Sequence, residues 1–407
     1  MEPAQPTSTP KRIPVDWTIM LAVVGLMILG VMFIYSARLS REGLDMAFTN
    51  RLAFRQLIWY VIGAGAMTAM CMTDYRIMSR YSYVAYWASI LALLLVLIPF
   101  IGTTHNMGAR RWIPLGFFSI QPSEFAKLAL ILAFANFLSR PLDELKLPGN
   151  FGKALAMMAL PFCLVLIEPD LGSALVLIPV GLAMMYVGHI PRKYLYSLVG
   201  CASLIIGILV ADVIFAPAQY RFPIQTYQRN RILVYFNMPA KYFAPPNATP
   251  AELKRAGEIR DNESYNIRQA LISVGSGGLT GKGWGQGKQN SLGYLPHAVA
   301  HNDFIFSVLA EEAGFIGSVV VIGLYSVILF AGIRIAAQSR DRLGRLVATG
   351  VTALLFSHVT INIGMNIRLM PVTGVPLPLM SSGGSFTLVT MLAIGLLQNV
   401  HMHRRAY

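Results

Sequence analysis

Long apolar segments recur along almost the whole chain, and they restrict its fold more than any other feature. A run of about 18 or more apolar residues is long enough to cross a bilayer as a helix. Only 13% of the 407 residues are charged and 55% are hydrophobic, whereas soluble globular domains carry roughly 25% charged residues. The sequence therefore predicts an all-α integral membrane protein with about ten transmembrane helices.

The apolar runs place the spans. We predict them at residues 17–37, 56–73, 83–101, 121–139, 153–168, 171–189, 194–215, 313–333, 346–366 and 382–401. The first run lacks a small-residue cleavage site, which favours a retained helix over a signal peptide. An even number of spans places both termini on the same side of the membrane.

Basic residues orient these spans, because Lys and Arg accumulate in cytoplasmic loops. Most basic residues of the short connections fall on the side of the termini. We therefore predict cytoplasmic tails at 1–16 and 404–407, one membrane domain at 17–403, and within it a large extracytoplasmic loop at 216–302 between the seventh and eighth helices. The net charge of +14 is spread over many connections, which indicates membrane lipid and not nucleic acid as the partner.

The long loop changes character along its length. Residues 236–262 are polar and rich in Pro and Ala, which is typical of an insertion. Residues 264–302 are rich in Gly, Gln, Asn and His but also contain Trp284 and Tyr294. A glycine-rich segment can be a flexible tether or can fold tightly against a ligand. The interleaved aromatic residues favour an ordered surface.

Acidic and basic residues at the outer lip of the spans are unfavourable in lipid and are therefore functional candidates. Asp303 lies where the long loop re-enters the membrane and can be a helix N-cap or a functional carboxylate. Glu311 and Glu312 follow, so three carboxylates are expected to cluster there. Glu124 and Lys127 share one helix face, where they form either a local ion pair or part of a site.

Further charged residues lie on the same predicted side. Arg110 and Arg111 precede Trp112 and either anchor the chain at the interface or bind phosphate. Asp170 begins the sixth helix, where it is either an N-cap or functional. Three arginines at the start of the long loop form a solvated face or bind an anionic headgroup: Arg221, Arg229 and Arg231.

The motifs around these residues resemble the SEDS family of bacterial cell-wall polymerases. The matching segments follow the family order over nearly the whole chain. They are Gly108-Ala109 with Arg111-Trp112 and Leu115-Gly116, Gln121-Pro122-Ser123-Glu124 with Lys127, Pro169-Asp170-Leu171-Gly172, residues 275–283, Asp303-Phe304-Ile305-Phe306 with Ala310-Glu311-Glu312, and residues 371–378 with 383–385. The Gly-Lys-Gly at 281–283 and the Val-Thr-Gly-Val-Pro-Leu-Pro at 372–378 resemble the RodA branch more closely than the FtsW branch.

The chain departs from the family pattern near the re-entry point. Leu295-Pro296-His297 stands in place of Leu-Pro-Glu, Asn302 in place of Thr, and Ser381-Ser382-Gly383-Gly384 in place of Ser-Tyr-Gly-Gly. These changes alter the local loop, whereas Asp303 matches the family's essential Asp.

The resemblance implies a ten-helix glycosyltransferase that polymerises lipid II into a nascent glycan strand. The reaction takes place at the outer face of the bacterial cytoplasmic (inner) membrane, during elongation and rod-shape maintenance, with a class B penicillin-binding protein (a transpeptidase) as partner. It implies an inverting transfer from an undecaprenyl-pyrophosphate-linked donor, with Asp303 as catalytic base and a divalent cation, Mg²⁺ or Mn²⁺, whose ligands are not assigned. The expected substrate-binding residues are Arg110, Arg111, Glu124, Lys127, Asp170, Arg221 and Arg229. A lipid II flippase or transporter and a non-catalytic scaffold for the transpeptidase are the alternatives.

Overall fold

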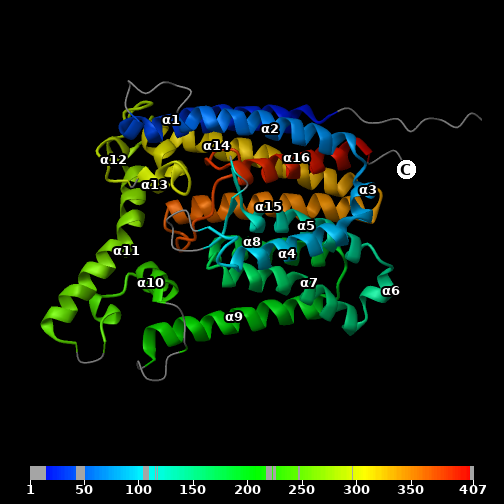
Figure 1. Ribbon diagram of the computed structural model, residues 1–407, viewed down its shortest axis with the longest axis horizontal. Coiled ribbons are helices and arrows are strands. Elements are labelled where there is room, and N and C mark those ends of the chain that lie inside the picture. The colour runs from blue at the N-terminus through cyan, green and yellow to red at the C-terminus, as the bar shows by residue number, and fades with distance from the viewer. Residues whose placement is uncertain are drawn as a thin grey trace, which may run out of the picture.

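A bundle of long helices makes up most of the molecule (Figure 1). The computed structural model describes residues 15–42, 51–103, 110–114, 116, 118–216, 222, 226–245, 248–295 and 297–403. The long helices are α1 (Trp17–Glu42), α2 (Leu52–Met72), α4 (Ser82–Leu97), α5 (Pro122–Leu138), α7 (Pro148–Ile167), α8 (Leu171–Val187), α9 (Arg192–Phe215), α14 (Ile305–Gln338), α15 (Arg342–Asn366) and α16 (Gly384–His403). Each predicted span coincides with one of these helices.

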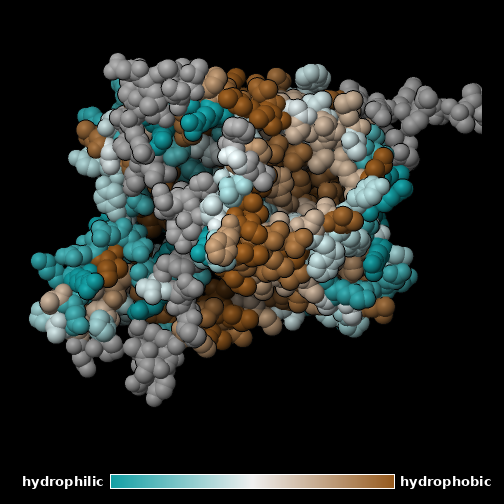
Figure 2. All heavy atoms as spheres, in the orientation of Figure 1, coloured by the Kyte–Doolittle hydropathy of each residue, from teal (hydrophilic) through white to brown (hydrophobic). Residues whose placement is uncertain are grey.

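On the face shown in Figure 2, the apolar surface forms a belt across the middle of the bundle, and the hydrophilic surface gathers toward its two ends. In the described part of the chain, six helices are long and apolar enough to cross a membrane, namely α1, α7, α9, α14, α15 and α16, and α4 and α8 are shorter apolar helices. This arrangement is that of a multi-pass membrane protein, because lipid can solvate only the apolar belt.

The two ends of the bundle differ in structure. The start of α1 and the end of α16 lie at one end, together with α3 (Tyr75–Arg80) and α6 (Leu142–Leu145) (Figure 1). The other end carries α10 (Thr226–Tyr235), η3 (Ala240–Phe243), α11 (Pro250–Ser276), α12 (Lys288–Ser291) and α13 (His297–Ala300). A short antiparallel pair, β1 (Ile113–Pro114) and β2 (Ser119–Ile120), precedes α5. The tails predicted at 1–16 and 404–407 lie almost wholly outside the described residues.

The structure refines two sequence predictions. The segment 236–262, expected to be an insertion, contains η3 and the first part of α11, which runs across the end of the bundle (Figure 1). Thr249 and Glu252 form a capping box there, with Pro250 in the first turn, a start signal that operates without an apolar run. The span predicted from residue 313 corresponds to the part of α14 that follows a kink at Gly314 (φ 67°, ψ −161°), and α14 as a whole begins earlier, at Ile305.

Close helix contacts at glycine hold the centre of the bundle together. A Cβ on Gly63 of α2 would lie 2.8 Å from Met391 of α16, and a Cβ on Gly172 of α8 would lie 2.7 Å from the carbonyl of Thr373. Small residues allow such approach, and packing of this kind stabilises helix association in lipid. The second contact brings the start of α8 against residues 371–379, the segment that borders the candidate site.

Candidate active site

Asp303 lies in the turn just before α14, and its backbone is fixed from α15. The carbonyl of Asp303 accepts hydrogen bonds from Nδ2 of Asn362 (3.0 Å) and Nδ2 of Asn366 (3.1 Å). Asn362 also donates to the carbonyl of Val375 (2.7 Å), and Ser381 Oγ donates to the carbonyl of Asn302 (2.6 Å). The 371–381 segment and α15 therefore hold the turn from two sides.

The side chain of Asp303 is not a helix cap. The N-cap position of α14 is Phe304, which makes no side-chain cap hydrogen bond. Oδ1 of Asp303 is buried and has no hydrogen-bond partner in the described structure, and Gly374, with φ +74°, passes so close that a Cβ there would lie 3.5 Å from Oδ2. The cap explanation is therefore wrong for Asp303, whose carboxylate stays available for another partner.

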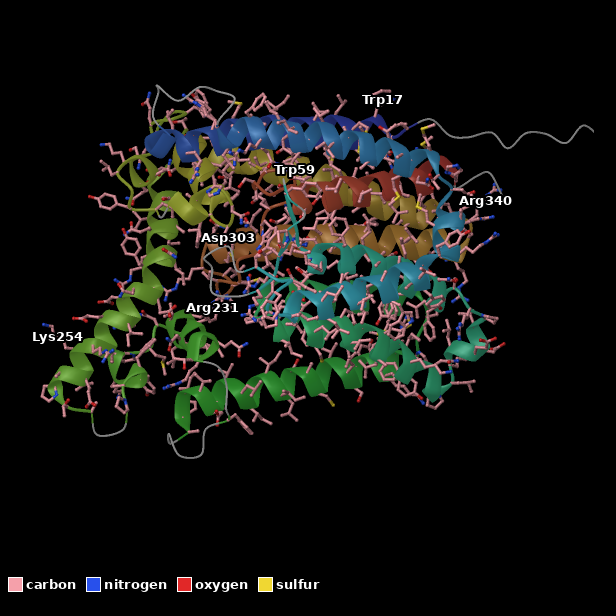
Figure 3. All side chains as sticks on the ribbon, viewed as in Figure 1. Trp17, Trp59, Arg231, Lys254, Asp303 and Arg340 are labelled. Atoms are coloured by element: carbon pink, nitrogen blue, oxygen red, sulfur yellow. The ribbon has the colours of Figure 1, made fainter. Side chains whose placement is uncertain are left out.

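Charges from three other segments act on this carboxylate. Burial and, after it, the negative charge of Asp170 raise the pKa of Asp303 to about 6, while the guanidinium groups of Arg231 and Arg111 oppose that rise. Arg231 belongs to α10, at the same end of the bundle as Asp303 (Figure 3). A carboxylate with a pKa near neutrality suits proton transfer, because both of its protonation states are accessible.

Lys127 and Glu124 form a buried ion pair on α5. Nζ of Lys127 lies 2.8 Å from Oε1 of Glu124, with side-chain exposures of 1% and 3%, and 3.1 Å from Nε2 of His358 on α15. A buried charge pair is retained only with good geometry and further hydrogen bonds. The local ion pair expected from the sequence is present, and His358 completes it.

Asp170 is both an N-cap and part of the polar network. Its Oδ1 accepts from the amide of Ser173 (3.1 Å) at the start of α8, and its Oδ2 accepts from Nε2 of Gln121 (3.0 Å). The backbone N–H of Gln121 donates in turn to Oγ of Ser385 (3.2 Å). The segment before α5, the start of α8 and the start of α16 are thereby joined.

The arginines predicted to bind substrate do not form one cluster in the described structure. Arg110 is exposed, whereas Arg111 turns inward and donates from Nε to the carbonyl of Glu168 (3.2 Å) and from Nη2 to the carbonyl of Pro169. Arg229 donates to the carbonyl of Tyr242 within the loop. Arg221 lies outside the described residues, as do Gly108, Ala109, Leu115 and Pro296 of the family motifs.

Glu311 and Glu312 do not join Asp303, contrary to the expected cluster of three carboxylates. Glu311 accepts from Nζ of Lys282 (2.6 Å) and from the amide of Gln289 (3.0 Å). Glu312 accepts from the amide of Gly285 (3.0 Å) and from Oγ of Ser36 (2.5 Å). The two acids fasten the glycine-rich segment 277–293 to α1 and α14, and this segment is ordered, as predicted.

The sequence reasoning missed a polar stripe on α15. His358, Asn362 and Asn366 recur at intervals of four residues, so they lie on one helix face. His358 contacts Lys127, while the two asparagines hold the backbone of Asp303. The sequence did carry a signal for this stripe, because polar side chains spaced i, i+4, i+8 in an apolar span indicate contacts inside the bundle.

The described carboxylates and histidines do not form a resident metal site. No group of three or more His, Cys, Asp or Glu side chains among the described residues has the geometry to hold a metal ion. Divalent Mg²⁺ demands near-octahedral oxygen coordination and commonly takes one or two carboxylates together with substrate phosphates.

Comparison with known proteins defines the class. Residues 16–406 match the family described as "Cell cycle protein", which comprises FtsW, RodA and SpoVE. The chain belongs to this family, the SEDS peptidoglycan glycosyltransferases.

Curated relatives match over nearly their full lengths. The chain is 33% identical to peptidoglycan glycosyltransferase MrdB of Escherichia coli (strain K12) over 97% of this chain and 95% of the relative. It is 35% identical to stage V sporulation protein E of Bacillus subtilis (strain 168), over 98% and 100% respectively. It is 31% identical to peptidoglycan glycosyltransferase RodA of Treponema pallidum (strain Nichols), over 95% and 97%.

Solved structures show the same fold. One, described as "Structural coordination of polymerization and crosslinking by a peptidoglycan synthase complex", matches with a TM-score of 0.75 and 27% identity over 96% of this chain and 99% of that chain. Thermus thermophilus rod shape determining protein RodA matches with a TM-score of 0.64 and 27% identity, over 96% and 98%.

Proposed function

We propose that this protein polymerises lipid II into glycan strands at the outer face of the cytoplasmic membrane. In this proposal the termini are cytoplasmic, the end of the bundle that carries α10–α13 faces outward, and the activity serves cell elongation. The names of the relatives support a peptidoglycan glycosyltransferase. The observation that carries the proposal is the buried Oδ1 of Asp303, which lacks a described partner and lies under the influence of Arg111 and Arg231.

The proposed transfer is a single displacement. The acceptor sugar hydroxyl of lipid II attacks the anomeric carbon of the glycan chain, and the bond from that carbon to the undecaprenyl pyrophosphate oxygen breaks with inversion. Asp303 takes the hydroxyl proton as general base, and the electron pair leaves with the pyrophosphate. Because pyrophosphate is a good leaving group, no covalent enzyme intermediate is needed.

The cationic residues give the leaving group its stabilisation. Negative charge grows on the pyrophosphate as the bond breaks, and preorganised positive groups at that position lower the barrier. Arg111 and Lys127 are proposed for this role, with Arg110, Arg221 and Arg229 binding the diphosphates at the periphery. Asp170 and Glu124 hold Gln121 and Lys127 in place, as their hydrogen bonds support.

A cation and a protein partner belong to the same proposal. Mg²⁺ or Mn²⁺ would arrive with the substrate diphosphate, since such ions are commonly shared between carboxylates and phosphates. A class B penicillin-binding protein is proposed as the transpeptidase partner. The structural relative described as a synthase complex for polymerization and crosslinking supports this choice.

A reconstituted polymerisation assay tests the proposal. Purified protein in liposomes receives labelled lipid II and Mg²⁺ or Mn²⁺, with and without its transpeptidase partner, and products are separated by length. We expect a ladder of glycan strands. Movement of lipid II across the bilayer without any polymer would support the flippase alternative. Polymer that forms only through the partner's own activity would support the scaffold alternative. Either result would overturn the proposal.

A further inference from the structure

Glu168, at the turn between α7 and α8, is a buried acid that none of the roles above explains. It is the C-cap residue of α7 and is 0% exposed. Both of its carboxylate oxygens lack a hydrogen-bond partner within the described part of the chain. An ionised carboxylate without a partner is strongly unfavourable in such surroundings, and a buried acid commonly takes up a proton instead.

The neighbouring charges do not neutralise this carboxylate. Arg111 directs its hydrogen bonds to the backbone carbonyls of Glu168 and Pro169, and no hydrogen bond joins it to the Glu168 side chain. Asp170 lies two residues further along at the start of α8 and adds negative charge. Burial, and then Asp170, raise the pKa of Glu168 to about 8, while Arg111 opposes the rise.

The charges around Glu168 balance only when it is neutral. Asp170 at the start of α8 and Arg111 before β1 act directly on Glu168. The wider network that these two residues join also holds Glu124 and Lys127 on α5, Asp303 before α14 and Arg231 on α10. Three negative groups then face three positive groups. Ionisation of Glu168 would leave one excess negative charge where a diphosphate must bind, and like charges at short range repel strongly in a low-dielectric site.

We propose that Glu168 is a positioning residue that works in its protonated form, keeping the charge around Arg111 and Asp170 balanced so that a diphosphate-linked substrate can bind. The inference rests on the proposed function, because the substrate of that reaction carries the diphosphate. Glu168 acts through Arg111 and Asp170 and does not touch the reacting atoms.

The pH dependence of polymerisation tests this role. Wild-type protein, Glu168→Gln, Glu168→Met and the exposed control Glu144→Gln are compared at sub-saturating lipid II from pH 6 to pH 9.5. We expect the wild type and Glu144→Gln to lose activity above about pH 8, close to tenfold per pH unit, mainly through a higher KM. Glu168→Gln should keep at least half of wild-type activity at pH 7 and lack this alkaline loss. An alkaline limb in Glu168→Gln equal to that of the wild type would overturn the proposal.

A second measurement separates failure of this inference from failure of the proposed function. Infrared difference spectra between pH 7 and pH 9.5 report a protonated carboxyl group directly, without any turnover. We expect a carboxylic acid C=O band to disappear on raising the pH of the wild type, and to be missing from both Glu168→Gln and Glu168→Met. If the band is present but no polymer forms at any pH, the proposed function fails. An identical band in wild type and variants shows that Glu168 releases no proton between pH 7 and pH 9.5 and refutes the inference.

Discussion

Removing the amide of Asn362 should disable catalysis by displacing Asp303 while leaving the fold intact. Asn362→Ala deletes the two hydrogen bonds that Nδ2 donates, of 3.0 Å to the carbonyl of Asp303 and 2.7 Å to the carbonyl of Val375, and the longer one of 3.4 Å that Oδ1 accepts from Asn366. Asn366 still bonds the first carbonyl, so one buried acceptor is left unsatisfied, at a cost of about 1–3 kcal/mol. A misplacement of about 1 Å at a reacting group can reduce the rate about 100-fold. We therefore expect modest destabilisation together with a large loss of kcat.

The chain offers a matched control at the opposite end of the bundle. Asn399 is also fully buried, and its Nδ2 donates to the backbone carbonyls of Met70, Cys71 and Thr73. Asn399→Ala should lower the unfolding midpoint in detergent by at least as much as Asn362→Ala. Polymerisation of lipid II per folded molecule should nevertheless stay near the wild-type value in Asn399→Ala and fall about 100-fold in Asn362→Ala. Equal losses in both variants, or full activity in Asn362→Ala, would refute the positioning argument.

Three further predictions concern charge. Lys127→Met leaves Glu124 buried without its partner and should destabilise the protein by about 3–5 kcal/mol, whereas the double variant Glu124→Leu/Lys127→Met should recover most of that stability. Thermal unfolding in detergent measures both changes. A double variant no more stable than Lys127→Met would contradict the prediction. The proposed base must be deprotonated, and the pKa of Asp303 is raised to about 6. Polymerisation activity should therefore rise with pH through about 6. A pH–rate profile that is flat from pH 5 to 7 would argue against Asp303 as the base. Chelation with EDTA should abolish polymerisation, and added Mg²⁺ or Mn²⁺ should restore it; unchanged activity in EDTA would remove the cation from the proposal.

The positions of the long helices could be predicted because membrane spans depend on local composition. An apolar run long enough to cross the bilayer is visible in any window of the sequence. Helix ends were less accurate: α14 starts at Ile305, and Glu311 and Glu312 in its first part are satisfied by the distant glycine-rich segment. Partners so far away in the sequence cannot be seen in a local window.

The candidate site was predicted in part for the same reason. Asp303, Lys127 and Asp170 stood out because acids and bases are rare next to lipid. The sequence could not separate a cap from a free carboxylate, since an acid at a helix start is compatible with both roles. The structure separates them: Asp170 caps α8, whereas Asp303 caps nothing. The sequence did not single out Glu168, because its burial depends on how the turn between α7 and α8 packs in the fold.

The most direct test of the account replaces the proposed base alone. Asp303→Asn preserves shape and removes the ionisable group, so the folded variant should still bind lipid II. Given labelled lipid II with Mg²⁺ or Mn²⁺ in the presence of the transpeptidase partner, the wild type is predicted to produce a glycan ladder and Asp303→Asn to produce none. Polymer from Asp303→Asn at the wild-type rate would contradict the central role of this carboxylate.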